Sequence, residues 1–202
     1  MCNKVKIGKT NERKKTIAIK CGFYHSVAMT ESGEVYVWGW NRCGQLGINS
    51  KENRVFEPQK VVNLNNIRIK QIECGTLCTF LLSNDGEVYA CGDNRRGRLG
   101  IGYESYCEKK VKKVKINEKI KRIYVRYDYY WLRDLTSFAL SETNKYYIWG
   151  NISENEKYCE PKLIDSNKQF ASIEDAIYYY RNVTYETIEC QKRSHNKVCC
   201  VI

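Results

Sequence analysis

The fold is decided by a nine-residue stretch that occurs twice, as Gly39-Trp40-Asn41-Arg42-Cys43-Gly44-Gln45-Leu46-Gly47 and as Gly92-Asp93-Asn94-Arg95-Arg96-Gly97-Arg98-Leu99-Gly100. The 53-residue offset between the copies also relates Cys21-Gly22 to Cys74-Gly75. Ten of the 13 glycines form five pairs at this offset: Gly22 and Gly75, Gly33 and Gly86, Gly39 and Gly92, Gly44 and Gly97, and Gly47 and Gly100. Self-similarity at a fixed period indicates a repeat architecture.

Each copy reads as two β-strands joined by a tight turn. In the first copy, residues 26–30 and 34–38 are short runs of β-favouring residues. The second copy has Asp85-Gly86 at the joint, and Asp-Gly between apolar runs predicts a hairpin because glycine accepts positive φ. Gly39 and Gly92 are expected just after the second strand, where a missing Cβ lets neighbouring backbone approach. No helical period exceeds about ten residues, so we predict an all-β fold.

A third, degenerate copy follows. Its strands are expected at residues 120–123, 137–141 and 147–151. The glycine–leucine loop (residues 41–47 and 94–100), in which Leu46 and Leu99 are expected to act as apolar plugs, is deleted from this copy. The copy carries an insertion at residues 128–134 instead.

The repeat motif has a familiar form. Cys-Gly-x-x-His-Ser followed by Gly-Glu-Val-Tyr-x-Trp-Gly-x-Asn-x-x-Gly-Gln-Leu-Gly resembles the regulator-of-chromosome-condensation repeat, closely over residues 21–47, well over 74–100 and in outline over 123–164. The resemblance implies blades of four antiparallel strands, which form a seven-bladed propeller in that family. It also implies structural roles for the ten paired glycines and Trp38, and we interpret His25 as a blade-packing residue.

Three blades are too few for a closed ring, which takes at least about four. We therefore expect a partial β-propeller, an open arc of about three four-stranded blades over residues 16–165. Open blade edges invite pairing with another chain, so self-association is one expectation. Residues 166–189 are a candidate partial blade or cap that would cover the arc.

The formal charge of +11 is concentrated in three segments. Residues 1–15, a basic N-terminal arm, carry +5, residues 108–126 carry +7 and residues 190–202 carry +3, so the remainder is −4. Such clustering indicates contact with an anionic surface. The arm and the 108–126 segment leave chromatin or nucleic-acid binding open as one function, although residues 111–116 also fit a strand with a solvated basic face.

The tail, residues 190–202, is expected to be disordered and matches a prenylation box. Cys199 stands fourth from the end before a terminal isoleucine, which resembles the geranylgeranyl class and implies a prenyltransferase as partner. Cys200 or Cys190 is a candidate for a second lipid, and the adjacent cysteines also resemble Rab-type double prenylation. Lys192, Arg193 and Lys197 would bind an anionic membrane surface. This predicts the cytoplasmic face of a membrane, in a eukaryote or, for a bacterial effector, in its host.

No catalytic, cofactor or metal constellation stands out. The chain has no Cys-x-x-Cys, its two histidines are His25 and His195, and it has no run of 18 apolar residues and no secretory leader. We interpret most of the 11 cysteines as reduced thiols in a cytosolic protein.

Three functions therefore remain. The resemblance favours a membrane-anchored regulator of a small GTPase, Ran or a relative, that promotes nucleotide exchange without covalent chemistry. A non-catalytic propeller scaffold is the alternative, and chromatin binding ranks third. The candidate contact residues are the aromatic and arginine side chains of the insertion: Tyr129, Tyr130, Trp131 and Arg133. A structural loop that plugs the arc is the alternative interpretation of this insertion.

Overall fold

The computed structural model describes residues 4–6, 13–64, 66–127, 135–152, 156–164, 170 and 175–176. The chain divides into two compact units, residues 1–164 and 165–202, and all the strands below belong to the first. Within the described residues, no helix is long and apolar enough to span a membrane. The candidate cap, residues 166–189, and the tail fall almost entirely outside them.

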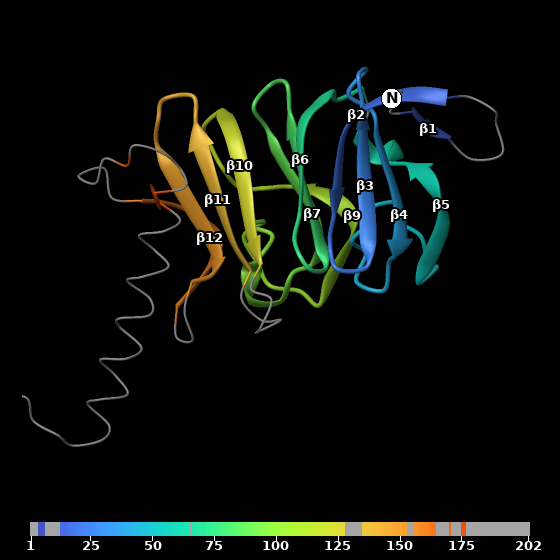
Figure 1. Cartoon of the computed structure of the whole chain (residues 1–202). Coiled ribbons are helices and arrows are strands. Elements are labelled where there is room, and N and C mark those ends of the chain that lie inside the picture. Colours follow the sequence, from blue (N-terminus) through green and yellow to red (C-terminus); the bar gives the residue numbers. More distant parts are fainter. Residues whose placement is uncertain are drawn as a thin grey trace, which may run out of the picture. The chain divides into compact units, whose positions relative to one another are not determined.

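The first unit consists of three antiparallel sheets, which we call blades 1, 2 and 3 (Figure 1). Blade 1 contains β1 (Lys4–Lys6), β2 (Arg13–Cys21), β3 (His25–Thr30), β4 (Val35–Trp40) and β5 (Arg54–Lys60). Blade 2 contains β6 (Ile69–Cys74), β7 (Cys78–Ser83), β8 (Val88–Asp93) and β9 (Cys107–Lys113). Blade 3 contains β10 (Ile120–Tyr127), β11 (Leu135–Ser141), β12 (Tyr146–Asn151) and β13 (Lys157–Leu163). Two short 3-10 turns lie at Val62–Leu64 and Arg95–Gly97.

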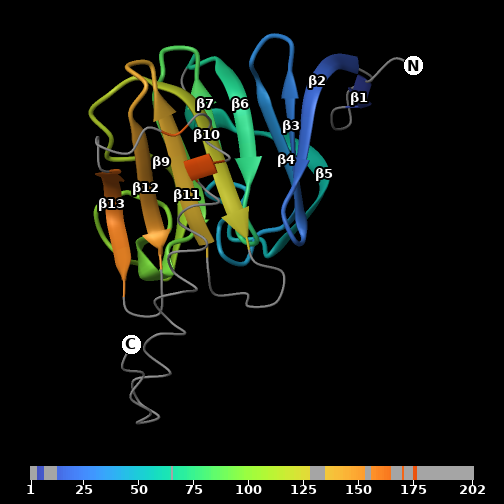
Figure 2. The same ribbon diagram turned by 60° about the vertical axis from the view of Figure 1, so that its left-hand side comes forward.

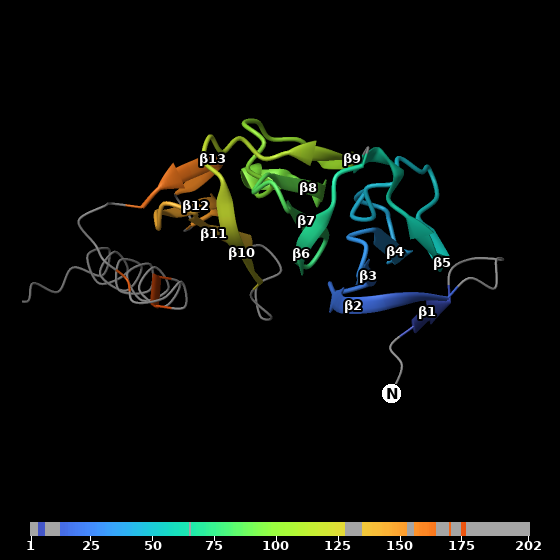
Figure 3. The ribbon, with the colours of Figure 1, turned by 90° about the horizontal axis from the view of Figure 1, so that it is seen from above.

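The blades stand side by side and the described sheets do not close a ring (Figure 3). The inner strands β2, β6 and β10 are neighbours, while β5, β9 and β13 form the opposite edges of their sheets (Figures 2 and 3). Gln71 of β6 joins two inner strands, because its side-chain amide donates to the Ile123 carbonyl of β10 at 2.6 Å and accepts from the Ile123 N–H at 3.0 Å. The predicted all-β fold with an open, partial propeller is confirmed.

Gly39 and Gly92 lie inside strands β4 and β8, and our prediction that they follow the strand is wrong. The backbone there has φ of 104° and 111°, at the point where each strand's register shifts against the outer strand. A Cβ on Gly39 would lie 2.5 Å from the Tyr24 carbonyl oxygen, and one on Gly92 would lie 2.3 Å from that of Leu77. The strand can therefore continue through this bulge only because no side chain is present.

The hydrophobic core lies between the blades. One cluster joins blades 1 and 2 and contains Val27, Met29, Val37, Leu46, Ile72 and Leu81; the other joins blades 2 and 3 and contains Phe80, Leu82, Leu99, Ile123, Ala139 and Trp149. Leu46 and Leu99 are almost completely buried, as expected of apolar plugs. Each glycine–leucine loop thus contributes one side chain to the core that joins its blade to the next.

Asn41 and Asn94 fold the two loops in the same way. The side-chain oxygen of each accepts a hydrogen bond from the N–H of the plug leucine at 3.2 Å. The side-chain N–H₂ donates to the carbonyl of Glu52 in the first loop and of Tyr103 in the second. One amide side chain therefore holds both ends of each loop, which explains why asparagine recurs at this position.

Each loop docks on the outer strand of the following blade. A Cβ on Gly44 would lie 2.6 Å from Cα of Lys109 in β9, and one on Gly97 would lie 2.5 Å from Cα of Cys159 in β13. Blade 3 has only five residues between β12 and β13, so it has no such loop. The deletion predicted from the spacing of the third copy therefore removes the element that would reach a further blade.

Candidate partner-binding site

Five side chains at one end of blade 1 form a cluster that we call the aromatic rim: Phe23, Tyr24, Trp40, Arg54 and Phe56. The rings of Phe23 and Tyr24 meet edge to face with centroids 4.7 Å apart, and Tyr24 lies 6.4 Å from Trp40. The Arg54 guanidinium lies over two rings, 5.3 Å from the centroid of Trp40 and 5.9 Å from that of Phe56. The cluster is thus a continuous row of ring and guanidinium planes.

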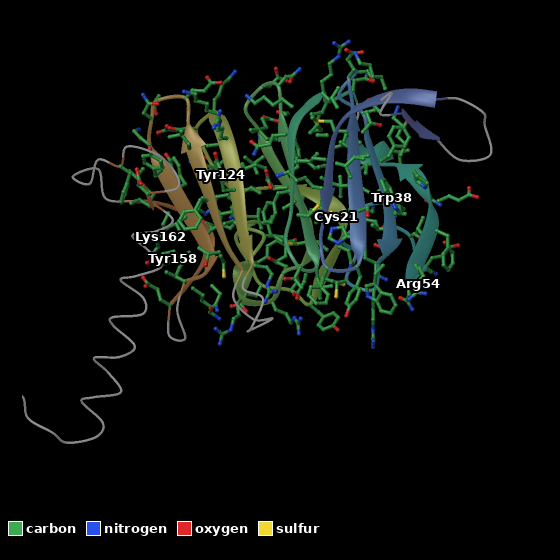
Figure 4. All side chains as sticks on the ribbon, viewed as in Figure 1. Cys21, Trp38, Arg54, Tyr124, Tyr158 and Lys162 are labelled. Carbon is green, nitrogen blue, oxygen red and sulfur yellow. The ribbon has the colours of Figure 1, made fainter. Side chains whose placement is uncertain are left out.

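Strand pairing holds the aromatic rim in place. Phe23 and Tyr24 occupy the β2–β3 turn, where the Tyr24 carbonyl accepts a hydrogen bond from the Trp40 N–H at 2.8 Å. Trp40 pairs with Arg54 across β4 and β5, which places Arg54 at the start of the outer strand (Figure 4). Backbone contacts in the sheet therefore preorganise these side chains before any partner arrives.

The aromatic rim is unusually exposed for its composition. Tyr24 is 62% exposed and Phe56 is 81% exposed. Aromatic and arginine side chains dominate the binding energy of protein interfaces. Scattered apolar residues are common on protein surfaces, but a contiguous group of them marks an interaction site. The rim is therefore a candidate surface for binding another protein.

Blade 2 has a smaller group of exposed aromatic and arginine side chains. Arg95 lies over the ring of Tyr106 at 5.5 Å, and Tyr106 and Tyr103 are both exposed. Asp93 replaces the tryptophan of blade 1 and pairs with Nη2 of Arg95 at 2.6 Å and with Nη1 of Arg98 at 3.2 Å. The exchange of a ring for a buried carboxylate leaves blade 2 with fewer exposed aromatic groups than blade 1.

His25 packs blade 1 against blade 2. It is buried, and its Nε2 lies 3.0 Å from the Thr79 hydroxyl of β7. That hydroxyl donates its single proton to the Gln45 carbonyl at 2.7 Å, so Nε2 of His25 must carry the hydrogen. Burial lowers the pKa of His25 to about 4. The side chain is therefore a neutral donor that links two blades, consistent with a packing role.

The basic segment 108–126 is divided between two strands. Lys109, Lys110 and Lys112 are exposed on β9 of blade 2, whereas Lys121 and Arg122 are exposed on β10 of blade 3. β10 lies beside β6 and β7 of blade 2, and β9 forms the other edge of that blade. The charges therefore belong to two sites on opposite edges, which weakens the case for one phosphate-binding strip.

Several predicted site residues lie outside the described part of the chain. These are the insertion residues Tyr129, Tyr130, Trp131 and Arg133 and the tail residues Cys190, Lys192, Arg193, Lys197, Cys199 and Cys200. Within the described part, the seven cysteines are free thiols and no group of three His, Cys, Asp or Glu side chains could hold a metal ion.

Sequence reasoning missed the aromatic rim. Its signal is the difference between the copies, since Phe23, Tyr24 and Trp40 stand where the second copy has Thr76, Leu77 and Asp93. These three positions gain an aromatic ring in the first copy while the surrounding framework is shared. The repeat pattern consists of the residues that the two copies share, whereas Phe23, Tyr24 and Trp40 lie at positions where the copies differ.

Comparison with known proteins gives partial relatives. The chain is 34% identical over 138 residues to the probable E3 ubiquitin-protein ligase HERC6 of Homo sapiens, covering 68% of this chain and 13% of the relative. It is 41% identical over 87 residues to the ultraviolet-B receptor UVR8 of Arabidopsis thaliana, covering 43% and 20%. The chain therefore spans at most a fifth of the length of these relatives.

Solved structures show the same fold. Human WBSCR16 superposes with a TM-score of 0.65 at 20% identity, covering 79% of this chain and 42% of that one. Prp20p of Saccharomyces cerevisiae, whose structure was described with its binding properties to Gsp1p and histones, gives 0.65 at 21% identity, covering 77% and 40%.

Family models match the repeated region itself. A regulator of chromosome condensation (RCC1) repeat model matches residues 32–82 and 85–123, and a second model of this repeat matches residues 17–45 and 69–98. The matched residues include both glycine–leucine loops and the strands on either side of them. The chain belongs to the RCC1 repeat family.

Proposed function

We propose that the chain is a regulator of a small GTPase, Ran or a relative, and that it binds the GTPase through the aromatic rim of blade 1. The exposed row of aromatic rings around Arg54 carries this proposal, because it has the composition and the rigidity of an interface hot spot. The binding of Gsp1p by Prp20p, a structural neighbour, supports the choice of partner class.

The proposed action requires binding energy and no covalent step. A partner that binds the nucleotide-free GTPase more tightly than the nucleotide-bound form lowers the affinity of the GTPase for nucleotide by the same factor, because the two binding equilibria are linked. The insertion at residues 128–134 joins the inner strand β10 of blade 3 to β11, as the turn with Phe23 and Tyr24 joins the inner strand β2 of blade 1 to β3. We retain Tyr129, Tyr130, Trp131 and Arg133 as further candidate contacts on that basis.

The test is release of a fluorescent guanine nucleotide from a panel of small GTPases, Ran first, with the full chain added. Tyr24→Ala and Arg54→Ala should each weaken the effect at least about tenfold, the loss expected of a hot-spot residue. Tyr106→Ala, an exposed tyrosine of blade 2, is the matched control and should change it less than about twofold. Failure to bind any GTPase, with or without nucleotide, would remove the proposal. Binding without release would leave the scaffold function.

We also propose that the tail holds this regulator at the cytoplasmic face of a membrane. The support is the sequence alone: Cys199 as the prenyl acceptor beside Lys192, Arg193 and Lys197. Labelled geranylgeranyl should be incorporated in a eukaryotic cytosolic extract, and Cys199→Ser should abolish incorporation. Equal labelling of the wild type and the variant, or none of either, would contradict the anchor.

A further inference from the structure

Equivalent residues of the three blades differ sharply in exposure on the side that faces the preceding blade. On the inner strands, Ile19, Ile72 and Ile123 hold equivalent positions. Ile72 is 1% exposed and Ile123 is completely buried, because each packs against the blade before it. Ile19 is 54% exposed. The described chain supplies nothing that covers this part of blade 1.

The middle strands repeat the pattern. Cys91 and Trp149 are buried beneath the preceding loop: a Cβ on Gly47 would lie 2.8 Å from Sγ of Cys91, and one on Gly100 would lie 2.7 Å from Cδ1 of Trp149. Trp38 is the equivalent residue of blade 1 and remains partly exposed (Figure 4). At two junctions this position therefore receives the last glycine of a glycine–leucine loop.

The outer strands show a third contact of the same kind. The N–H of Asn49 donates to the Lys109 carbonyl at 2.9 Å, and that of Gly102 donates to the Cys159 carbonyl at 2.8 Å. Each donor lies just after a glycine–leucine loop, and each acceptor lies on the following blade. Phe56 is the equivalent of Lys109 and Cys159 in blade 1, and its side chain is largely exposed.

One part of this side of blade 1 is already covered. Tyr36 is buried, since the Lys14 ammonium lies 5.9 Å from its ring centroid and is held by Glu34. The uncovered part, which we call the open socket, consists of Ile19, Cys21, Trp38 and Phe56. These are the positions whose equivalents contact the preceding loop or the core behind it, so the open socket fits the glycine–leucine loop of a blade.

We propose that the open socket of blade 1 is a docking site for an RCC1-type blade of another protein chain, one that carries an intact glycine–leucine loop. The two internal junctions supply the template, since the same positions are covered there by the same element. A second copy of this chain does not offer it: blade 3 has no loop, and the loops of blades 1 and 2 are docked within the chain. The required partner chemistry is a leucine plug followed by a glycine that can approach Trp38.

This proposal is separate from GTPase binding. The open socket and the aromatic rim share only Phe56, so Ile19 and Trp38 report on the socket. Tyr24 reports on the rim, whereas Arg54 does not separate the two sites, because its equivalent in blade 3, Lys157, pairs with Glu104 of the preceding blade. Substitution of Ile19 should leave nucleotide release unchanged, and substitution of Tyr24 should leave socket occupancy unchanged. Either proposal can therefore fail without the other.

The experiment presents a loop to the socket at high local concentration. A copy of residues 40–50, with Cys43→Ser in that copy, is fused to the N-terminus of the full chain through a flexible Gly/Ser linker, which gives an effective concentration in the millimolar range. Alkylation of the exposed Cys21 thiol by iodoacetamide is followed by peptide mass spectrometry. The control fusion carries Leu46→Asp in the added copy, and a second control carries Ile19→Asp in the socket.

A docked loop should slow Cys21 alkylation about tenfold relative to both controls, the protection expected when the socket is occupied nine-tenths of the time. The same fusion should shift the indole NMR signal of Trp38 and leave that of Trp149 unchanged. Equal alkylation rates in all three proteins would overturn the proposal. So would protection of Cys21 in the unfused chain that grows with protein concentration, because the occupant would then be a second copy.

Discussion

Blades 1 and 2 share the same framework residues but differ on the face that points toward the preceding blade. This face is exposed in blade 1 and buried in blade 2. Ile72 lies in the core between blades 1 and 2, whereas its equivalent Ile19 faces solvent. The two residues have the same type and strand position, and they pair with Ala28 and Leu81 in their own sheets. What separates them is the blade that packs on Ile72, which identifies the interface between blades as the unit of stability.

Introducing a carboxylate at Ile72 and at Ile19 should give the largest difference in stability between the two blades. Ile72→Asp buries an unpaired carboxylate and should cost more than about 4 kcal/mol of unfolding free energy, enough to prevent folding in a marginal domain. Ile19→Asp places the same carboxylate in solvent and should change stability by less than about 0.5 kcal/mol. Urea denaturation of both variants measures the contrast. Similar losses would mean that Ile19 is covered.

Protonation of His25 should weaken the junction between blades 1 and 2. Its folded-state pKa of about 4 lies below the ordinary value of 6.5, so the unfolded chain binds more protons between these pH values. The contribution of neutral His25 to the free energy of unfolding is therefore fully present above about pH 6.5. It declines by up to about 3 kcal/mol as the pH falls to 4. His25→Gln should flatten this part of the pH profile relative to the wild type. Parallel profiles would show that His25 is not the titrating group.

Substitution of a glycine at a loop contact should cost more unfolding free energy than substitution of a glycine beside a flexible side chain. Gly97→Ala brings a Cβ to 2.5 Å from Cα of Cys159, so we expect a loss of more than about 2 kcal/mol from strain and clash. Gly102→Ala also has positive φ, but it meets the mobile end of Lys115 and should cost about 1 kcal/mol. Thermal unfolding of the pair measures the difference, and the reverse order would contradict the proposed docking of the loop.

The smallest expected difference in stability is between the polar contacts at the two junctions between blades. Thr79→Val removes the hydroxyl between His25 and the Gln45 carbonyl and should cost about 1–2 kcal/mol, because two buried polar groups lose their partner. Ser137 is the equivalent residue of blade 3, and its buried hydroxyl has no hydrogen-bond partner within the described structure. Ser137→Ala should therefore be neutral within about 0.5 kcal/mol. Equal losses in chemical denaturation would mean that the two junctions are held in the same way.

The sequence predicts the framework of this fold well and its surfaces poorly. The 53-residue offset and the Asp-Gly turn locate the hairpins, and the missing loop of the third copy follows from spacing alone. The bulges at Gly39 and Gly92 could not be placed from sequence, because they depend on the backbone of the β2–β3 and β6–β7 turns, which is distant along the chain. The aromatic rim was missed because its rings come from three separate segments that only the sheet brings together.

Blades 2 and 3 are each closed by the loop of the blade before them, whereas blade 1, within the described chain, has this face open. Cys21 and Cys74 are equivalent cysteines that test this difference directly, since Cys21 is exposed and burial raises the pKa of the Cys74 thiol. Alkylation of the native full chain, resolved by peptide mass spectrometry, should modify Cys21 on the order of 100-fold faster than Cys74. Equal rates for the two thiols would mean that this face of blade 1 is covered as it is in blade 2.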